Sequence, residues 1–563
     1  MTRLWNTRLR WLPLAAVYLI SLGAYSVPWT GDQKLYISIA REMREAGSWL
    51  LPRFLGETRY FKPPFQYWVT WLGFDVFGLN FWGALLPSVI AAFATAALLN
   101  AILRLDSAGA PRHGVDARDP HTGWNAGALF LLTLGTLTYA TVAQMEIHVC
   151  LFQAAAWWLG LKAVDQTERF RTPWLFAAFT VAGAAAWVKS PAYSAFWVLG
   201  YGFYLYMSGR VSRLKRPEFW AALVWGVVVG LAWYVAVLKF DGARFWDEYI
   251  VRESLEKKNG NTGSAASLWY ALFYFCFPFT LMIAFALREL ILDRRRDFRA
   301  LFLGWLLPPA IFFTLHPYRV KTYLYVLVPL FCMALSRVPR RHLPQWIRLT
   351  SGIVPFLLLS ALALVLRRAD LVPLWLSIGL VLAGALQLGI ARNRDGLFLT
   401  GAALAVLVVR LSAISLGEAD IAPLRALTAT LNPSGENTRI VMWDESANVW
   451  HEAGLLSLAL ARPIERLAKQ AEIEKAIESG ATALITDEQK AAFTSGAALH
   501  SSAALQWTPW ARWKARAKFP FRELMAEGAS VLGPDHELLK RSFWFVRRGV
   551  PGGAGAPAPT KPF

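Results

Sequence analysis

The sequence predicts a mainly α-helical protein that crosses a membrane many times and ends in a small α/β domain. Three observations support this fold class. The 563 residues are 56% hydrophobic, with a mean hydropathy of +0.36, which is more apolar than a typical soluble domain. Many apolar runs of about 20 residues carry no charge, and that length lets a helix cross a hydrocarbon core of ~30 Å. Basic residues gather in alternate connections between these runs.

Thirteen membrane-spanning helices are predicted from the apolar runs. The last of them ends near Leu416, where the composition turns polar. The predicted spans start near Trp11, Phe81, Trp124, Ile147, Trp174, Pro191, Phe219, Leu268, Ala300, Thr322, Ser351, Leu374 and Leu397.

The basic residues set the orientation of these spans. If the N-terminus is cytoplasmic, every even-numbered connection is cytoplasmic too, and each of those connections is basic, as the positive-inside rule requires. The opposite short connections are poor in positive charge, except at Arg367-Arg368 and at Arg319 with Lys321. Membrane topology therefore accounts for the net charge of +20, and no nucleic-acid partner is predicted. The cytoplasmic residues are Arg104, Arg112, Arg118, Arg169, Arg171, Arg210, Arg213, Lys215, Arg216, Arg294, Arg295, Arg296, Arg299, Arg337, Arg340, Arg341, Arg348, Arg392 and Arg394.

Residues 417–563 follow the last predicted span and fall on the outer side of the membrane. Short strand-like runs alternate with helix-like stretches there, which is typical of a small α/β domain. The strand-like runs are Arg439–Trp443, Ala483–Thr486 and Phe543–Val546, and Ala468–Ser479 resembles a helix. The stretch Gly552–Pro562 is rich in Gly, Ala and Pro and is predicted to be a disordered end.

Two acids are predicted to lie on the outer face. Asp32 follows the first span by five residues, and a carboxylate at the mouth of a helical bundle can accept a proton from a hydroxyl group. Its alternative role is a helix N-cap, because a helix-like stretch begins near Tyr36. Glu146 is the only acid in the tight connection between the third and fourth spans. It could orient a ligand or assist a metal, whereas the nearby His148 is interpreted as a packing residue.

Several basic and aromatic residues are predicted on the same face. Tyr60 and Lys62 lie in the first outer loop, where a cation could hold a phosphate, although snorkelling at the membrane interface is equally compatible. Lys189 ends the fifth span beside a Ser-Pro break, and a nearly buried ammonium group needs a negative partner. Arg319 and Tyr323 lie between the ninth and tenth spans, where positive charge opposes the positive-inside trend.

These residues come from four separate connections, yet the topology places them all on one face. The topology was derived from apolar runs and cytoplasmic arginines, so it did not depend on them. Charged groups within or at the mouth of a membrane bundle are costly and usually functional. The coincidence therefore predicts one site, with an anionic ligand such as a polyprenyl phosphate.

The layout resembles the GT-C superfamily of membrane glycosyltransferases. The likeness is closest to bacterial aminoarabinose transferases, which modify lipid A, and extends to related protein O-mannosyltransferase-like enzymes. It covers roughly residues 20–335 and rests on six motifs in the order that the family has them. The matching segments are Asp32–Tyr36 with Ala40–Met43, Trp49–Leu55, Tyr60–Pro63, Glu146, Lys189–Pro191 and Arg319–Pro329.

The resemblance implies a catalytic transmembrane domain in residues 1–416 and a periplasmic soluble domain in residues 417–563. It implies an inverting transfer of a sugar from polyprenyl (undecaprenyl) phosphate to lipid A, another glycan or a protein, at the periplasmic face of a bacterial inner membrane. Asp32 would act on the acceptor as base or orienter, and Glu146 would align the sugar or acceptor. The substrate-binding residues would be Tyr60, Lys62, Lys189, Arg319 and Tyr323, the last four on the phosphate.

The sequence departs from the family pattern at several positions. Gln33 and Leu35 stand where the family has an acid and an arginine, the Glu expected before Lys62 is missing, and the second outer loop lacks the usual histidine. That Glu and that histidine resemble metal ligands in aminoarabinose transferases. No cofactor and no metal ligand are therefore assigned, and the resemblance leaves a divalent metal open.

Two other classes of protein fit part of the pattern. Many spans and charged groups within them also suit a membrane transporter or flippase of a lipid-linked or anionic substrate. The sequence has no internal repeat, its outer loops are large and its unusual charges share one side, which favours an enzyme. The third class is a membrane anchor for a C-terminal binding module. The partners expected of an enzyme are a lipid-linked sugar, a lipid or glycan acceptor and membrane lipids.

Overall fold

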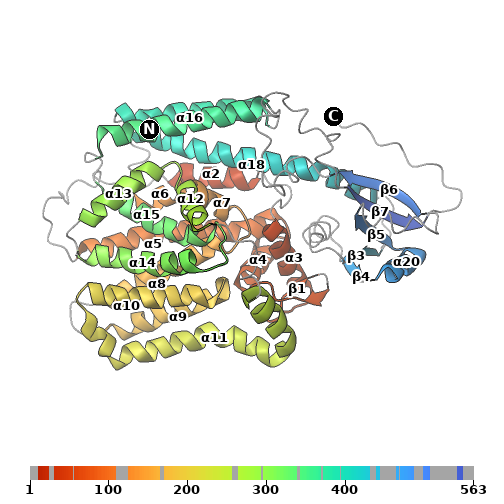
Figure 1. Cartoon of the computed structure of the whole chain (residues 1–563), viewed down its shortest axis with the longest axis horizontal. Coiled ribbons are helices and arrows are strands. Elements are labelled where there is room, and N and C mark those ends of the chain that lie inside the picture. Colours follow the sequence, from red (N-terminus) through yellow and green to blue (C-terminus); the bar gives the residue numbers. More distant parts are fainter. Residues whose placement is uncertain are drawn as a thin grey trace.

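The structure is a computed structural model in which a bundle of helices carries a β-sheet beyond one end (Figure 1). It describes the chain apart from residues 1–10, 24–30, 55, 109–124, 165–169, 256–263, 293–295, 339–342, 369–371, 393–394, 432–438, 444–463, 468, 487–498, 507–541 and 549–563. The stretch predicted to be a disordered end, Gly552–Pro562, lies outside the described residues.

Helices make up most of the described chain. In the first half they are α2 (Trp11–Gly23), α3 (Gly31–Glu45), α4 (Phe65–Phe77), α5 (Phe81–Ala108), α6 (Ala126–Leu131), α7 (Leu134–Ala140), α8 (Glu146–Ala163), α9 (Thr172–Val188), α10 (Pro191–Met207), η2 (Val211–Lys215) and α11 (Pro217–Phe245). They continue with η3 (Trp246–Leu255), α12 (Ala265–Phe275), α13 (Thr280–Leu292), α14 (Arg296–Leu315), η5 (Tyr323–Leu327), α15 (Val328–Ser336), α16 (Gln345–Arg368), α17 (Leu374–Gln387), η7 (Leu388–Arg392), α18 (Asp395–Leu431) and α20 (Gln470–Glu478).

Many of these helices are apolar enough to lie in a membrane. By length and composition, five described helices could cross one alone, within α5, α11 with η3, α14, α16 and α18, and the bent pair α12 and α13 would make a sixth. Shorter apolar helices include Trp11–Gly23, Thr172–Val188, Tyr323–Ser336 and Leu374–Ile390. Each of the thirteen predicted spans overlaps a helix or a broken pair of helices, and the count of thirteen crossings stays a prediction.

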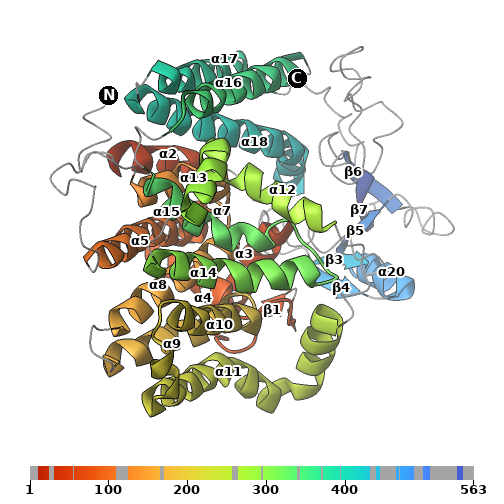
Figure 2. The same ribbon diagram turned by 60° about the vertical axis from the view of Figure 1, so that its left-hand side comes forward.

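The helices form layers along the bundle. Helices α16, α17 and α18 pack against one another along one side, and α9, α10 and α11 lie along the opposite side (Figure 2). Between them, α5, α8, α14 and α15 form the middle of the bundle (Figure 1). The interior is filled by aromatic and aliphatic side chains, including the fully buried Trp157, Trp197 and Tyr201.

Two predicted spans are broken inside the bundle, and the breaks face each other. Helix α6 stops before Thr133, whose hydroxyl accepts a hydrogen bond from Thr136 N–H at the start of α7. Helices α12 and α13 are bent by 108° at a break that contains Pro278, which has no N–H to continue a helix. Leu134 N–H donates to the Phe277 carbonyl at 2.9 Å. This bond matters because lipid cannot satisfy a free backbone group.

Segments that were predicted to lie outside the membrane meet at one end of the bundle. Helix α3, the short antiparallel strands β1 (Arg53–Phe54) and β2 (Glu57–Thr58), and the end of α11 all lie there. The first outer loop is anchored to η3 by a hydrogen bond from Arg59 Nη1 to Glu248 at 3.0 Å. The connection between α10 and α11, which carries Arg210, Arg213 and Arg216, lies at the other end (Figure 1).

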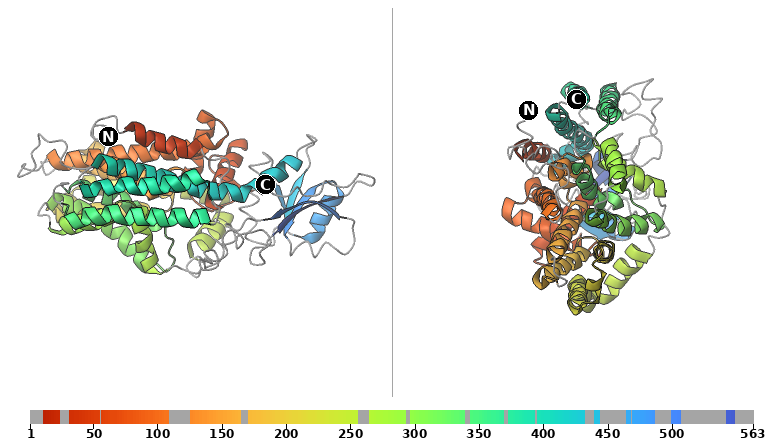
Figure 3. Two further views of the ribbon diagram at one scale, coloured as in Figure 1. Left: turned by 90° about the horizontal axis from the view of Figure 1, so that it is seen from above. Right: turned by 90° about the vertical axis from the view of Figure 1, so that its left-hand side faces the viewer.

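A five-stranded mixed sheet follows α18, which itself runs past Leu416 to Leu431. The strand order is β4-β3-β5-β7-β6, with β3 parallel to β4 and β5, and β7 antiparallel to β5 and β6. Figure 3 shows this sheet beyond the same end of the bundle as α3. The strands are β3 (Ile440–Trp443), β4 (Ile464–Leu467), β5 (Thr482–Thr486), β6 (Leu499–Gln506) and β7 (Ser542–Arg548). Its division from the membrane part near residue 416 stays a prediction.

The contact between α10 and α14 leads to a stability prediction. A Cβ atom on Gly200 would overlap the backbone carbonyl of Gly304, so the two helices touch through their backbones. Gly200→Ala should therefore force them apart and destabilise the protein by about 1–3 kcal/mol. Gly202→Ala, on the same helix, is the matched control because nothing lies within 4 Å of a Cβ atom there. Thermal unfolding of the detergent-solubilised protein measures both, and equal melting temperatures would contradict the close contact.

Candidate functional site

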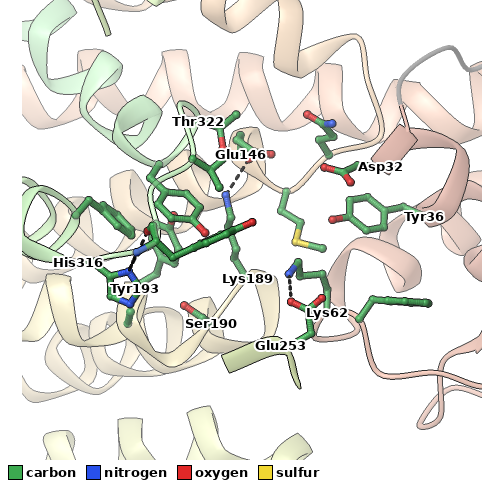
Figure 4. Close-up of a pocket in the computed structure, with 18 of the residues that line it drawn as sticks. Asp32, Tyr36, Lys62, Glu146, Lys189, Ser190, Tyr193, Glu253, His316 and Thr322 are labelled. Carbon is green, nitrogen blue, oxygen red and sulfur yellow. Dashed lines mark hydrogen bonds and ion pairs between the residues drawn. The ribbon is translucent and has the colours of Figure 1, made fainter. Parts of the chain in front are cut away.

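A cavity of about 570 Å³ lies where the ends of several helices meet, on the side of the bundle that carries α3 (Figure 4). Five of the seven predicted site residues line it, namely Asp32, Lys62, Glu146, Lys189 and Tyr323. The sequence interpretation did not single out its other polar lining residues, which are Tyr36, Gln144, Ser190, Tyr193, Tyr249, Glu253, His316, Tyr318 and Thr322.

Glu146 and Lys189 form an ion pair at the ends of two antiparallel helices. Glu146 is the first residue of α8, and Lys189 is the C-cap of α9. A helix N-terminus favours a negative charge and a C-terminus a positive one, so the helix dipoles stabilise both groups. Lys189 Nζ donates to Glu146 Oε1 at 2.8 Å, and the two side chains are only 13% and 10% exposed. Because both charges are largely removed from water, each requires the other.

A second ion pair joins the first outer loop to η3. Lys62 Nζ donates to Glu253 Oε2 at 3.0 Å. Burial disfavours the ammonium form of Lys62, but the nearby Glu253 carboxylate outweighs that effect and raises the pKa of Lys62 above its usual value. Lys62 therefore stays positively charged in the cavity. Both lysines of the cavity, Lys62 and Lys189, thus carry a positive charge that a carboxylate already compensates.

Asp32 is the cavity acid that has no basic partner among the described residues. It lies in the first turn of α3, next to Tyr36 and opposite the Glu146–Lys189 pair (Figure 4). Within the described part of the chain its carboxylate makes no hydrogen bond and no ion pair, and the residue is exposed to the cavity. An exposed, unpaired carboxylate can accept a proton from a bound group.

Tyr60 and Arg319 are not among the residues that line the cavity. Tyr60 is buried, its hydroxyl donates to Asp241 at 2.9 Å and its backbone N–H donates to Glu248 at 3.0 Å. It thereby fixes the loop that carries Lys62. The Arg319 guanidinium donates to the Thr314 carbonyl through Nη2 at 3.1 Å and Nε at 3.3 Å.

Aromatic side chains form one wall beside the charged pairs. The Tyr323 ring lies 5.2 Å from Lys189 Nζ, and the Tyr193 ring lies 5.8 Å from it. His316 also lines this wall, and its Nδ1 lies 3.1 Å from the backbone nitrogen of Tyr318. His148, by contrast, is buried against the ring of Phe65. This position agrees with its interpretation as a packing residue.

The donor set of the cavity differs from that of a metal site. Within the described residues, no group of three His, Cys, Asp or Glu side chains is placed to hold a metal ion. Glu146 and Glu253 are instead each bonded to a lysine, and the Glu that the family resemblance implies before Lys62 is missing from the sequence. The described residues of the cavity therefore do not make up the donor set of a metal centre.

The sequence is similar to curated proteins that carry a name. No family model matches the sequence. The chain is 26% identical over 328 residues to an undecaprenyl phosphate-alpha-4-amino-4-deoxy-L-arabinose arabinosyl transferase of Enterobacter sp. (strain 638), covering 56% of this chain and 55% of the relative. It is 28% identical over 337 residues to the protein of that name from Pseudomonas paraeruginosa, covering 57% of each. The chain thus spans a little over half the length of the curated relatives that it matches.

The fold has a counterpart among solved structures. A crystal structure of ArnT from Cupriavidus metallidurans bound to undecaprenyl phosphate superimposes with a TM-score of 0.69 at 16% identity, covering 87% of this chain and 94% of that one. The structure of the same protein in the apo state gives 0.66 at 17% identity, with the same coverage. The chain is therefore a multi-pass helical membrane protein with the fold of ArnT, and the resemblance to aminoarabinose transferases that its motifs predicted is confirmed.

Proposed function

We propose that the chain is an inverting glycosyltransferase that moves a sugar from an undecaprenyl phosphate carrier to a lipid A, glycan or protein acceptor. The observation that carries this proposal is the charge arrangement of the cavity, in which two lysines lie with an acid that has no described basic partner. The names of the relatives and the fold of the undecaprenyl phosphate-bound ArnT structure support the same reading.

The reaction needs positioning more than covalent chemistry. The acceptor oxygen attacks the anomeric carbon of the sugar from the face opposite the phosphate, and the bond from that carbon to the phosphate oxygen breaks. The phosphate leaves with the bonding electron pair, and the acceptor proton passes to Asp32. Lys62 and Lys189 stabilise the charge that develops on the departing phosphate, an effect that is strong in a site largely removed from water. Glu146 keeps Lys189 oriented for this task.

The proposed location is the periplasmic face of a bacterial inner membrane. With thirteen crossings and a cytoplasmic N-terminus, the cavity and the C-terminal sheet would both lie outside the cytoplasm. Their position at one end of the bundle supports this assignment (Figure 3).

A topology experiment tests this location. An alkaline phosphatase fusion after residue 443, the end of β3, should be active, because that enzyme folds only after export. A fusion in the basic connection between α10 and α11, at Gly209, should be inactive. The opposite pattern would contradict the periplasmic assignment and, with it, access of the cavity to a periplasmic acceptor.

Asp32→Asn should remove most turnover without weakening carrier binding. Asn keeps the shape of Asp but cannot take a proton, so a hydroxyl acceptor should react roughly 10²–10⁴-fold more slowly. A phosphate acceptor is already ionised and should be affected less. The measurement is turnover with a defined lipid-linked sugar, beside undecaprenyl phosphate binding on the same preparation. Normal turnover with every acceptor would mean that Asp32 has only a structural role in α3.

Lys62→Ala and Lys189→Ala should each weaken undecaprenyl phosphate binding by roughly 10- to 150-fold, as expected when one charge-assisted hydrogen bond is lost. Arg319→Ala should have a smaller effect, because this guanidinium is bonded to the Thr314 carbonyl. Lys321→Ala is the control, since Lys321 is exposed in the same outer segment and does not line the cavity. Binding to the purified variants is measured directly, and wild-type affinity in both cavity variants would refute the phosphate site.

A further inference from the structure

The charges that line the cavity are unevenly matched. Among the described lining residues, three side chains are carboxylic acids and two are lysines. Each lysine already has a carboxylate within 3.0 Å, Glu146 for Lys189 and Glu253 for Lys62. An anion that enters this cavity therefore meets lysines whose charge is compensated, together with the additional negative charge of Asp32.

The two lipids that this cavity would bind in turn differ in charge. A sugar linked through phosphate to a polyprenyl carrier is a phosphodiester and carries one negative charge. The carrier released by transfer is a phosphate monoester, which carries close to two negative charges at neutral pH because its second pKa is about 6. A carboxylate that remains near the phosphate repels the released carrier more strongly than the donor.

We propose that Glu253 is a specificity-determining residue that makes the cavity favour the monoanionic phosphodiester over the dianionic monoester. This inference rests on the proposed function. Glu253 suits the role because it bonds Lys62 from η3. This element is separate from the ends of α8 and α9, which carry the Glu146–Lys189 pair, and from α3, which carries Asp32. It reduces the net attraction of Lys62 for any anion, and the reduction scales with the charge of the ligand. Release of the spent carrier is therefore favoured.

The expected size of this effect on lipid affinity follows from Coulomb's law. One extra unit charge at about 6 Å from a carboxylate, at an effective dielectric constant of about 20, corresponds to roughly a hundredfold in affinity. Rearrangement of the lipid and of the side chains reduces this value, so a change of at least about tenfold in the ratio of the two affinities is expected.

The test compares two lipids that differ by one methyl group and, through it, by this charge. Undecaprenyl phosphate and undecaprenyl methyl phosphate are bound to the purified full-length protein in detergent at pH 8. In Glu253→Gln, undecaprenyl phosphate should bind at least about tenfold more tightly relative to the methyl ester than it does in the wild type. Glu253→Asp keeps the charge and should keep the wild-type ratio.

Glu248→Gln provides the matched control. Glu248 also lies on η3 and also forms an ion pair with the first outer loop, through Arg59, but it does not line the cavity. The loss of this carboxylate should leave the ratio of affinities unchanged. A change in Glu248→Gln as large as that in Glu253→Gln would overturn the assignment to Glu253.

A measurement on the wild-type protein keeps the proposal testable if Glu253→Gln does not fold. As the pH rises from 5 to 8, undecaprenyl phosphate gains its second charge, and its affinity relative to the methyl ester should fall. Binding of both lipids with a ratio unchanged by pH, or unchanged by Glu253→Gln, would overturn this inference alone. Failure of both lipids to bind the wild type would overturn the proposed function and the inference together.

Discussion

The Glu146–Lys189 ion pair is the interaction on which the outer end of the bundle depends. Neither charge could remain where it is without the other, because both side chains are nearly buried between apolar helices. The pair joins the start of α8 to the end of α9, one residue before the Ser-Pro break that opens α10. Thr322, just before η5, lies beside Glu146 (Figure 4). One contact thus fixes the relative positions of segments that are far apart in the sequence.

Close packing along the helices brings these helix ends together at the cavity. Glycines let α9 meet α11 at Gly183 and Gly226, and let α10 meet α14 at Gly200 and Gly304, with backbone against backbone. In a membrane, where neighbouring lipid is as apolar as a leucine side chain, such close van der Waals contact is a main source of helix association. The helix ends that carry Glu146, Lys189 and Ser190 are consequently held within reach of one another.

The cavity is completed by a layer of loops held through polar contacts. Arg59 and Tyr60 are bonded to Glu248, Tyr60 is bonded to Asp241, and Lys62 is bonded to Glu253. These contacts attach the first outer loop to the end of α11 and to η3. Two of the acids in the cavity are bonded to lysines, whereas Asp32 has no basic partner among the described residues. The three acids therefore differ in their surroundings, although their side chains have nearly the same intrinsic acidity.

Sequence patterns alone predicted the membrane class, a helix or broken pair of helices at each of thirteen apolar runs, and the meeting of Asp32, Lys62, Glu146, Lys189 and Tyr323 in one cavity. Apolar length and arginine placement depend only on transfer of local segments from water to lipid, so they can be seen in sequence. The tertiary structure decided the facing breaks between α6 and α7 and between α12 and α13. It also decided that Tyr60 and Arg319 make contacts outside the cavity lining. The pairing of Lys62 with Glu253 spans 191 positions. Such a contact follows from the packing of whole helices and not from any local pattern, which is why the sequence did not reveal that Glu253 pairs with Lys62.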